Sequence, residues 1–156
     1  MARRPPLLDE GAVAPDWSLR SHTGTSHHRE PGWTVLVFFR DRPACRAQLR
    51  RAEVLRPRFE EQGCQLYGVT TADRATVREL VAAERLGYPV LLDEGARLAE
   101  AFRATTRRPL GRPRTAPAVF LVNPAGTVRL ANRGHPSLEA VLRSIQALRA
   151  ATPAGM

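Results

Sequence analysis

The first core strand and the start of the helix behind it read Thr34-Val35-Leu36-Val37-Phe38-Phe39 and Arg40-Asp41-Arg42-Pro43-Ala44-Cys45. The unbroken apolar run predicts a strand covered on both faces, as in the interior of an α/β sheet. Cys45 then stands where a helix begins, and unpaired backbone N–H groups and the helix dipole favour a thiolate there. Because arginines such as Arg42 reinforce this effect, we predict a reactive thiol.

An alternative reading makes Cys45 a small buried hydrophobic residue. It lies on one apolar helical stripe with Leu49, Ala52, Leu55 and Phe59. A residue that is on this stripe and also in the first turn is expected to be half covered, at the strand end where α/β proteins bind ligands. We therefore prefer the reactive interpretation.

Length and composition predict one domain over residues 13–150, preceded by a loose lead-in over residues 1–12. The net charge of +9 raises nucleic acid as a partner, but all 24 basic residues are arginine and they are scattered among 15 carboxylates. The densest basic stretch, residues 103–114, offers no aromatic residue between Arg107 and Arg114 on which a base could stack. Nucleic acid is therefore not an expected partner.

Two cysteines are too few for a disulfide framework, and residues 1–6 lack the apolar run of a signal peptide. The longest apolar run, residues 35–39, is too short to span a bilayer. These features predict a cytoplasmic protein without a membrane partner. His27 and His28 lack ligand partners at metal-binding spacing, so we expect neither a metal nor another cofactor.

The remaining patterns predict an alternation of strands and helices. The order is a hairpin, a β-α-β-α unit, a second hairpin and a final helix, which gives a mixed sheet with helices on both faces. Pro57 should kink the first helix or shift one of its boundaries. The expected segments after the first core strand are a helix at 43–62, a strand at 64–70, a helix from Asp73 to Gly87, an extended segment at 89–93, a short helix at 96–102, strands at 118–122 and 127–130, and a helix from Ser137.

This order resembles the thioredoxin fold, and local sequence resembles the peroxiredoxins of the alkyl hydroperoxide reductase and thiol-specific antioxidant group. The resemblance covers about residues 12–148. It is carried by Ala14-Pro15-Asp16-Trp17-Ser18-Leu19, Thr23-Gly24, Val35 to Arg40, Cys45-Arg46-Ala47-Gln48-Leu49, Pro89 to Asp93 and Ala116 to Gly126.

The resemblance implies that Cys45 is the peroxidatic cysteine, which attacks a hydroperoxide and becomes a sulfenic acid. It also implies that Pro117 is a cis-proline facing that cysteine. Where peroxiredoxins carry threonine or serine, this chain has Arg42, and the position of their site arginine falls near Pro117. Arg114, Arg40 or Arg42 is then the candidate to stabilise the thiolate and the peroxide.

Cys64 is the obvious candidate for a resolving thiol, but a helix of about 18 residues, roughly 27 Å long, separates it from Cys45. A disulfide needs Cα atoms within about 7 Å, so we expect Cys64 to be a buried strand residue. His135, at the entrance to the last helix, is expected to be structural.

The sequence thus predicts a thiol-dependent peroxidase that uses one cysteine on hydrogen peroxide or organic hydroperoxides. Its expected partners are a hydroperoxide and an external thiol reductant, either thioredoxin-like or of low molecular weight, with a homodimer as a further expectation. Two alternatives stay open, the first because the threonine and a second site cysteine are missing. They are a thioredoxin-fold binding module without catalysis and a thiol-disulfide oxidoreductase acting on a protein.

Overall fold

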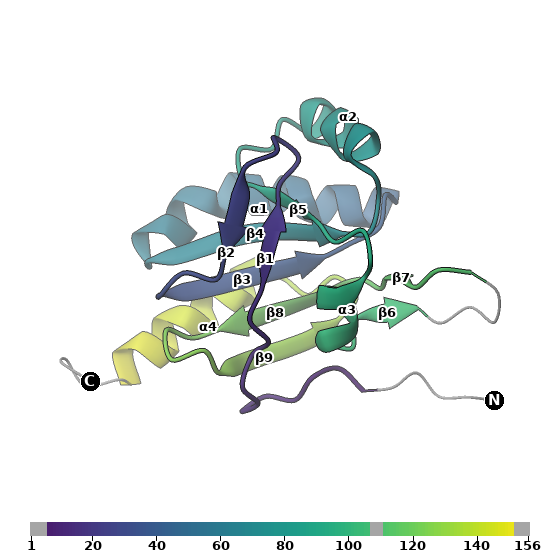
Figure 1. Ribbon diagram of the computed structural model, residues 1–156. Coiled ribbons are helices and arrows are strands. Elements are labelled where there is room, and N and C mark those ends of the chain that lie inside the picture. Colours follow the sequence, from purple (N-terminus) through teal and green to yellow (C-terminus); the bar gives the residue numbers. More distant parts are fainter. Residues whose placement is uncertain (1–5, 107–110, 152–156) are drawn as a thin grey trace.

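A five-stranded mixed sheet forms the centre of the protein (Figure 1). The computed structural model describes residues 6–106 and 111–151. In spatial order the strands are β5 (Val90–Leu92), β4 (Cys64–Thr70), β3 (Trp33–Phe38), β8 (Ala118–Val122) and β9 (Val128–Arg133). β3 is the middle strand, as its apolar sequence predicted, and every one of its residues is buried.

The strand directions bring two distant parts of the chain to one edge of the sheet. β3 pairs in parallel with β4 and antiparallel with β8, and β8 pairs antiparallel with β9. β9 therefore runs in the same direction as β3. Phe38, Ala118 and Arg133 form one row across the three strands. The carboxyl ends of β3 and β9 therefore lie at the same end of the sheet.

Helices cover both faces of this sheet, as the sequence predicted. Among the described residues they are α1 (Pro43–Glu61), α2 (Arg74–Glu84), α3 (Arg97–Ala101) and α4 (Leu138–Ala151). Val35 and Val37 of β3 share a core cluster with α1, α2 and α4, whereas Leu36 and Phe38 share a second cluster with α3. Successive strand residues point to opposite faces, so all four can be apolar and buried.

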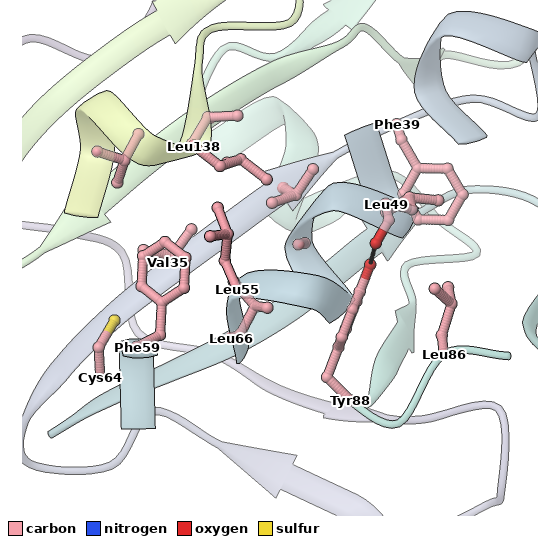
Figure 2. Packing of buried hydrophobic residues seen from close by; sticks show 14 of the residues in the cluster. Val35, Phe39, Leu49, Leu55, Phe59, Cys64, Leu66, Leu86, Tyr88 and Leu138 are labelled. Carbon is pink, nitrogen blue, oxygen red and sulfur yellow. Dashed lines mark hydrogen bonds between the residues drawn. The ribbon is translucent and has the colours of Figure 1, made fainter. Parts of the chain in front are cut away.

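The first core cluster runs along α1 (Figure 2). Leu49, Leu55 and Phe59 of this helix are buried against the sheet. The hydroxyl of Tyr88 donates to the Leu49 carbonyl at 2.8 Å, which satisfies its polar end inside the core. α1 also continues through Pro57, so this proline does not end the helix.

Shorter elements flank the central sheet. The expected first hairpin is present as β1 (Ser18–Arg20) and β2 (Ser26–His28), while β6 (Thr105–Thr106) and β7 (Arg114–Thr115) form a small pair that the sequence did not predict. Of the basic stretch between them, Arg107 and Arg108 lie outside the described residues.

The described part of the expected lead-in is hydrogen-bonded to the domain. Leu8 N–H donates to the Phe102 carbonyl at 3.1 Å, and Gly11 N–H donates to the Val128 carbonyl at 2.7 Å. The division of the chain into a lead-in and one domain stays a prediction. In the described ranges, no helix combines the length and apolar character needed to cross a membrane.

Candidate active site

Cys45 lies in the first turn of α1, just beyond the end of β3. Arg42 is the N-cap residue and Pro43 opens the helix, where a missing backbone N–H costs no hydrogen bond. The expectation of a half-covered sulfur is wrong, because Cys45 is fully buried at 0% exposure. The apolar stripe that it shares with Leu49 turns it toward the core.

His135 is the side chain that meets the Cys45 sulfur. Its Nε2 lies 3.2 Å from Cys45 Sγ, although the two residues are 90 positions apart in sequence. His135 is exposed and Cys45 is buried, so the imidazole connects the sulfur to the surface. The expectation of a purely structural His135 did not anticipate this contact.

The short segment between β9 and α4 holds His135 from both sides. Gly134 adopts φ +77°, a left-handed conformation that favours glycine, and its N–H donates to the Pro117 carbonyl at 2.8 Å. On the other side, Gln48 Nε2 donates to the Pro136 carbonyl at 3.3 Å. Gln48 lies one turn after Cys45 on α1, so the same helix positions the thiol and the histidine segment.

Burial and charge have opposite effects on the Cys45 thiol. Burial is the larger effect and raises its pKa, because a thiolate loses hydration in the core. A backbone hydrogen bond from Arg40 and the charges of Arg42 and Arg40 lower the pKa, while Asp41 raises it. The predicted electropositive surroundings are therefore present, but burial outweighs them and the pKa is raised overall.

Ion pairs order the charged residues around this helix start. Arg46 donates to Asp41 at 2.7 Å and to Glu84 at 3.3 Å, and Arg50 donates to Glu84 at 2.6 Å. The hydrogen bond from Arg46 lowers the pKa of Asp41, and the one from Arg50 lowers that of Glu84. Glu84 thereby ties the end of α2 to the first turns of α1.

A cavity of about 610 Å³ opens beside the site, at the carboxyl ends of β3 and β4. Arg40, Arg42 and Arg114 line it together with Asp41 and Thr70, and Cys45 is not part of its wall. The structure thus brings the candidate arginines to one hollow next to the cysteine. Asp73 and Glu94 also line it, so guanidinium and carboxylate groups face the hollow together.

The expectation of a cis-proline at residue 117 is wrong, because the Ala116–Pro117 bond is trans. β7 runs on into β8 with only Ala116 and Pro117 between them. The carbonyl of Pro117 instead accepts the Gly134 hydrogen bond. Pro117 therefore supports the segment that carries His135.

Cys64 lies at the opposite end of the parallel strands from Cys45. It starts β4, where it pairs in register with Trp33 at the start of β3. Burial raises the pKa of its thiol to about 12. In Figure 2 it lies beside Phe59, near the far end of α1. α1 has 19 residues, a length of about 28 Å, so Cys64 is not placed to react with Cys45.

No group of three or more metal-ligating side chains gathers in the part of the chain that the structure describes. The side chains gathered at the site are a cysteine, a histidine and nearby guanidinium groups. This combination is typical of thiol redox or nucleophilic chemistry.

A mixed sheet with helices on both faces and a cysteine at the start of α1 defines a thioredoxin-like protein with a cysteine site. The chain matches the AhpC/TSA family over residues 11–131 and belongs to that family. A comparison with curated protein sequences found no match.

Solved peroxiredoxin structures share this thioredoxin-like fold. Peroxidoxin BcpB from Mycobacterium tuberculosis is 22% identical, with a TM-score of 0.79 over 92% of this chain and 98% of that one. AhpC from Mycobacterium bovis is 19% identical, with a TM-score of 0.81 over 97% and 98% of the two chains. A yeast mitochondrial 1-Cys peroxiredoxin is 19% identical, with a TM-score of 0.81 over 96% and 83%.

Proposed function

We propose that the chain reduces hydroperoxides through Cys45 in a single-cysteine mechanism. Membership of the AhpC/TSA family supports thiol peroxidase activity. The observation that carries the proposal is the placement of the Cys45 sulfur at a helix start, in contact with His135 Nε2 at 3.2 Å and with the backbone of Arg40. These groups can stabilise a thiolate and the charge that develops on a departing oxygen.

The reaction is a two-electron transfer at sulfur. The Cys45 thiolate attacks the terminal oxygen of ROOH, the O–O bond breaks, and Cys45 becomes a sulfenic acid while RO⁻ takes up a proton to give ROH. One external thiol then displaces water to form a mixed disulfide. A second external thiol attacks this disulfide, which regenerates Cys45 and releases the oxidised reductant.

The position of Cys64 argues for an external reductant. Its sulfur is buried near the far end of α1, and its thiol has a strongly raised pKa. The yeast 1-Cys peroxiredoxin is described as resolved through glutathione and thioredoxin systems. We propose a reductant of the same chemical class here, either a thioredoxin-like protein or a small thiol.

The arginine-lined cavity supports an entry route for the substrate. Arg40, Arg42 and Arg114 present guanidinium groups at the carboxyl end of β3, next to the buried thiol. Hydrogen peroxide is small enough to reach a covered sulfur after a slight local opening. The guanidinium groups can donate hydrogen bonds to the oxygens of a hydroperoxide.

The remaining partner and location proposals follow from the same chemistry. A free thiol that cycles through a sulfenic acid needs a reducing compartment, so we propose a cytoplasmic location. A second copy of the chain stays a prediction, which a measurement of molar mass in solution would test.

Peroxide consumption with a generic dithiol tests the proposed function. We expect turnover by the wild type, none by Cys45→Ser, and near wild-type turnover by the matched control Cys64→Ala. Turnover that survives in Cys45→Ser would contradict the proposal. No turnover by the wild type would instead favour the binding module, and mixed disulfides with a protein in place of peroxide turnover would favour thiol-disulfide exchange.

A further inference from the structure

We propose that His135 is a catalytic proton carrier for Cys45: it takes the thiol proton before attack and returns it to the departing oxygen. This inference rests on the proposed peroxidase function and deepens it. The observation that carries it is the 3.2 Å contact between His135 Nε2 and Cys45 Sγ, made by a buried sulfur and an exposed imidazole.

The contact is built into the fold. Cys45 follows the end of β3 and His135 follows the end of β9, and Phe38 and Arg133 mark the same edge of the sheet. Hydrogen bonds of the flanking residues then fix the segment, from Gly134 to Pro117 and from Gln48 to Pro136. An imidazole that is held on both sides keeps its ring nitrogen against the sulfur.

Burial explains why the thiol needs such a partner. An isolated thiolate in the core loses its hydration, and this effect dominates the ionisation of Cys45. Proton transfer to His135 converts a neutral pair into an ion pair without adding net charge. The thiolate then forms beside an imidazolium that compensates it.

The charged groups near the pair act on the thiol in both directions or are engaged in ion pairs. Arg40 and Arg42 favour the thiolate and Asp41 opposes it. Beyond His135, Glu139 of α4 is paired with Arg51 of α1. His135 Nε2 lies within hydrogen-bond distance of the sulfur, and an imidazole can both accept a proton and return it.

Each proton is accounted for in this scheme. The Cys45 thiol gives its proton to Nε2 of a neutral His135, leaving a thiolate and an imidazolium. The thiolate forms the S–O bond as the peroxide O–O bond breaks, and the imidazolium protonates the leaving RO⁻. His135 ends neutral, the peroxide is reduced, and the sulfur is oxidised to the sulfenic acid.

The test measures Cys45 alkylation by iodoacetamide and peroxide consumption as functions of pH, in a Cys64→Ala background. The variants are His135→Asn and His135→Ala, and the matched control is His28→Asn, which removes an exposed histidine of β2. Thermal unfolding confirms that each variant is folded. His135→Ala is also assayed with added imidazole, which can reach the vacated position because His135 is exposed.

We expect both His135 variants to lose about a hundredfold in peroxide consumption at neutral pH and to lose the imidazole titration from the alkylation profile. Free imidazole should restore part of the activity of His135→Ala, and His28→Asn should match its background. A purely structural His135 would show neither the changed pH profile nor the rescue.

Two results would overturn the inference. One is peroxide consumption by folded His135→Asn with the rate and pH profile of its background. The other is an alkylation profile of the Cys64→Ala background that shows one titration step from the thiol and no second step from an imidazole. This result does not depend on the folding of any His135 variant. The proposed function fails differently: the background consumes no peroxide, even where the His135 variants change the alkylation profile.

Discussion

At the scale of single residues, the site depends on a balance between burial and charge at one sulfur atom. Burial raises the pKa of Cys45, while a backbone hydrogen bond from Arg40 and the guanidinium charges of Arg42 and Arg40 lower it. The sequence correctly identified these basic neighbours. It could not predict the dominant effect, because the depth of a side chain depends on packing between distant elements.

Arg42→Gln tests the contribution of charge at this scale. Removal of the guanidinium should raise the pKa of Cys45 further, since Arg42 favours the thiolate. We expect alkylation of Cys45 at neutral pH to slow by a few-fold, a small effect because Arg42 is exposed to solvent.

The matched control for this charge change is Arg58→Gln, in the last turn of α1. It removes the same charge about 20 Å along the helix from Cys45. An equal slowing in both variants would mean that net charge, rather than the local position of Arg42, affects the thiol.

At the scale of elements, strand order explains what sequence analysis found and what it missed. The strand and helix around Cys45 were predictable, because β3 and α1 carry clear apolar patterns. The second hairpin was also predictable, and the thioredoxin resemblance implied that Pro117, just before it, faces the cysteine. The contact that follows from the end of β9 was not predicted: β9 ends at the same end of the sheet as β3, and this brings His135 to the sulfur.

Gly134→Ala tests how the segment between β9 and α4 positions His135. A Cβ at Gly134 would meet no atom within 4 Å, so the substitution changes only the cost of the φ +77° backbone. We expect a loss of about 1–2 kcal/mol in the free energy of unfolding.

The functional consequence of Gly134→Ala should follow the position of His135. A shifted imidazole would lower the rate of peroxide consumption, and the alkylation profile would move toward that of His135→Asn. Gly63→Ala is a control with similar geometry, since Gly63 has φ +67° and an equally open Cβ position. Loss of stability with unchanged Cys45 reactivity would contradict a positioning role for this segment.

At the scale of the whole molecule, the thioredoxin-like sheet separates the two cysteines and gathers the reactive groups at one edge. Cys64 lies at the amino end of the parallel strands, and Cys45 follows their carboxyl end. The sequence predicted this separation from the length of the intervening helix. It did not predict a trans Ala116–Pro117 bond, because the thioredoxin resemblance implied the opposite isomer.

The charge network around α1 predicts how global stability depends on pH. Hydrogen bonds from Arg50 and Arg46 lower the pKa of Glu84 in the folded protein. In the unfolded chain Glu84 lacks these partners, so it takes up a proton at a higher pH than in the folded protein. The resulting stabilisation is present above the unfolded value, about pH 4.3, and is lost as pH falls through the lower folded value.

Thermal unfolding between neutral and acidic pH measures this linkage. Glu84→Gln should lower the melting temperature at neutral pH, and its melting temperature should fall less than that of the wild type on acidification. Glu79→Gln removes the same charge from an exposed position of α2 and serves as the control. Equal pH dependence of wild type and Glu84→Gln would show that this carboxylate does not link α2 to α1 energetically.

The most direct test of the account is the mass of each cysteine peptide after the reduced protein meets one equivalent of hydrogen peroxide and a sulfenic-acid trap. The account predicts the trapped adduct on Cys45, an unmodified Cys64, and no disulfide between them. An adduct on Cys64, a Cys45–Cys64 disulfide, or an unmodified Cys45 would contradict it.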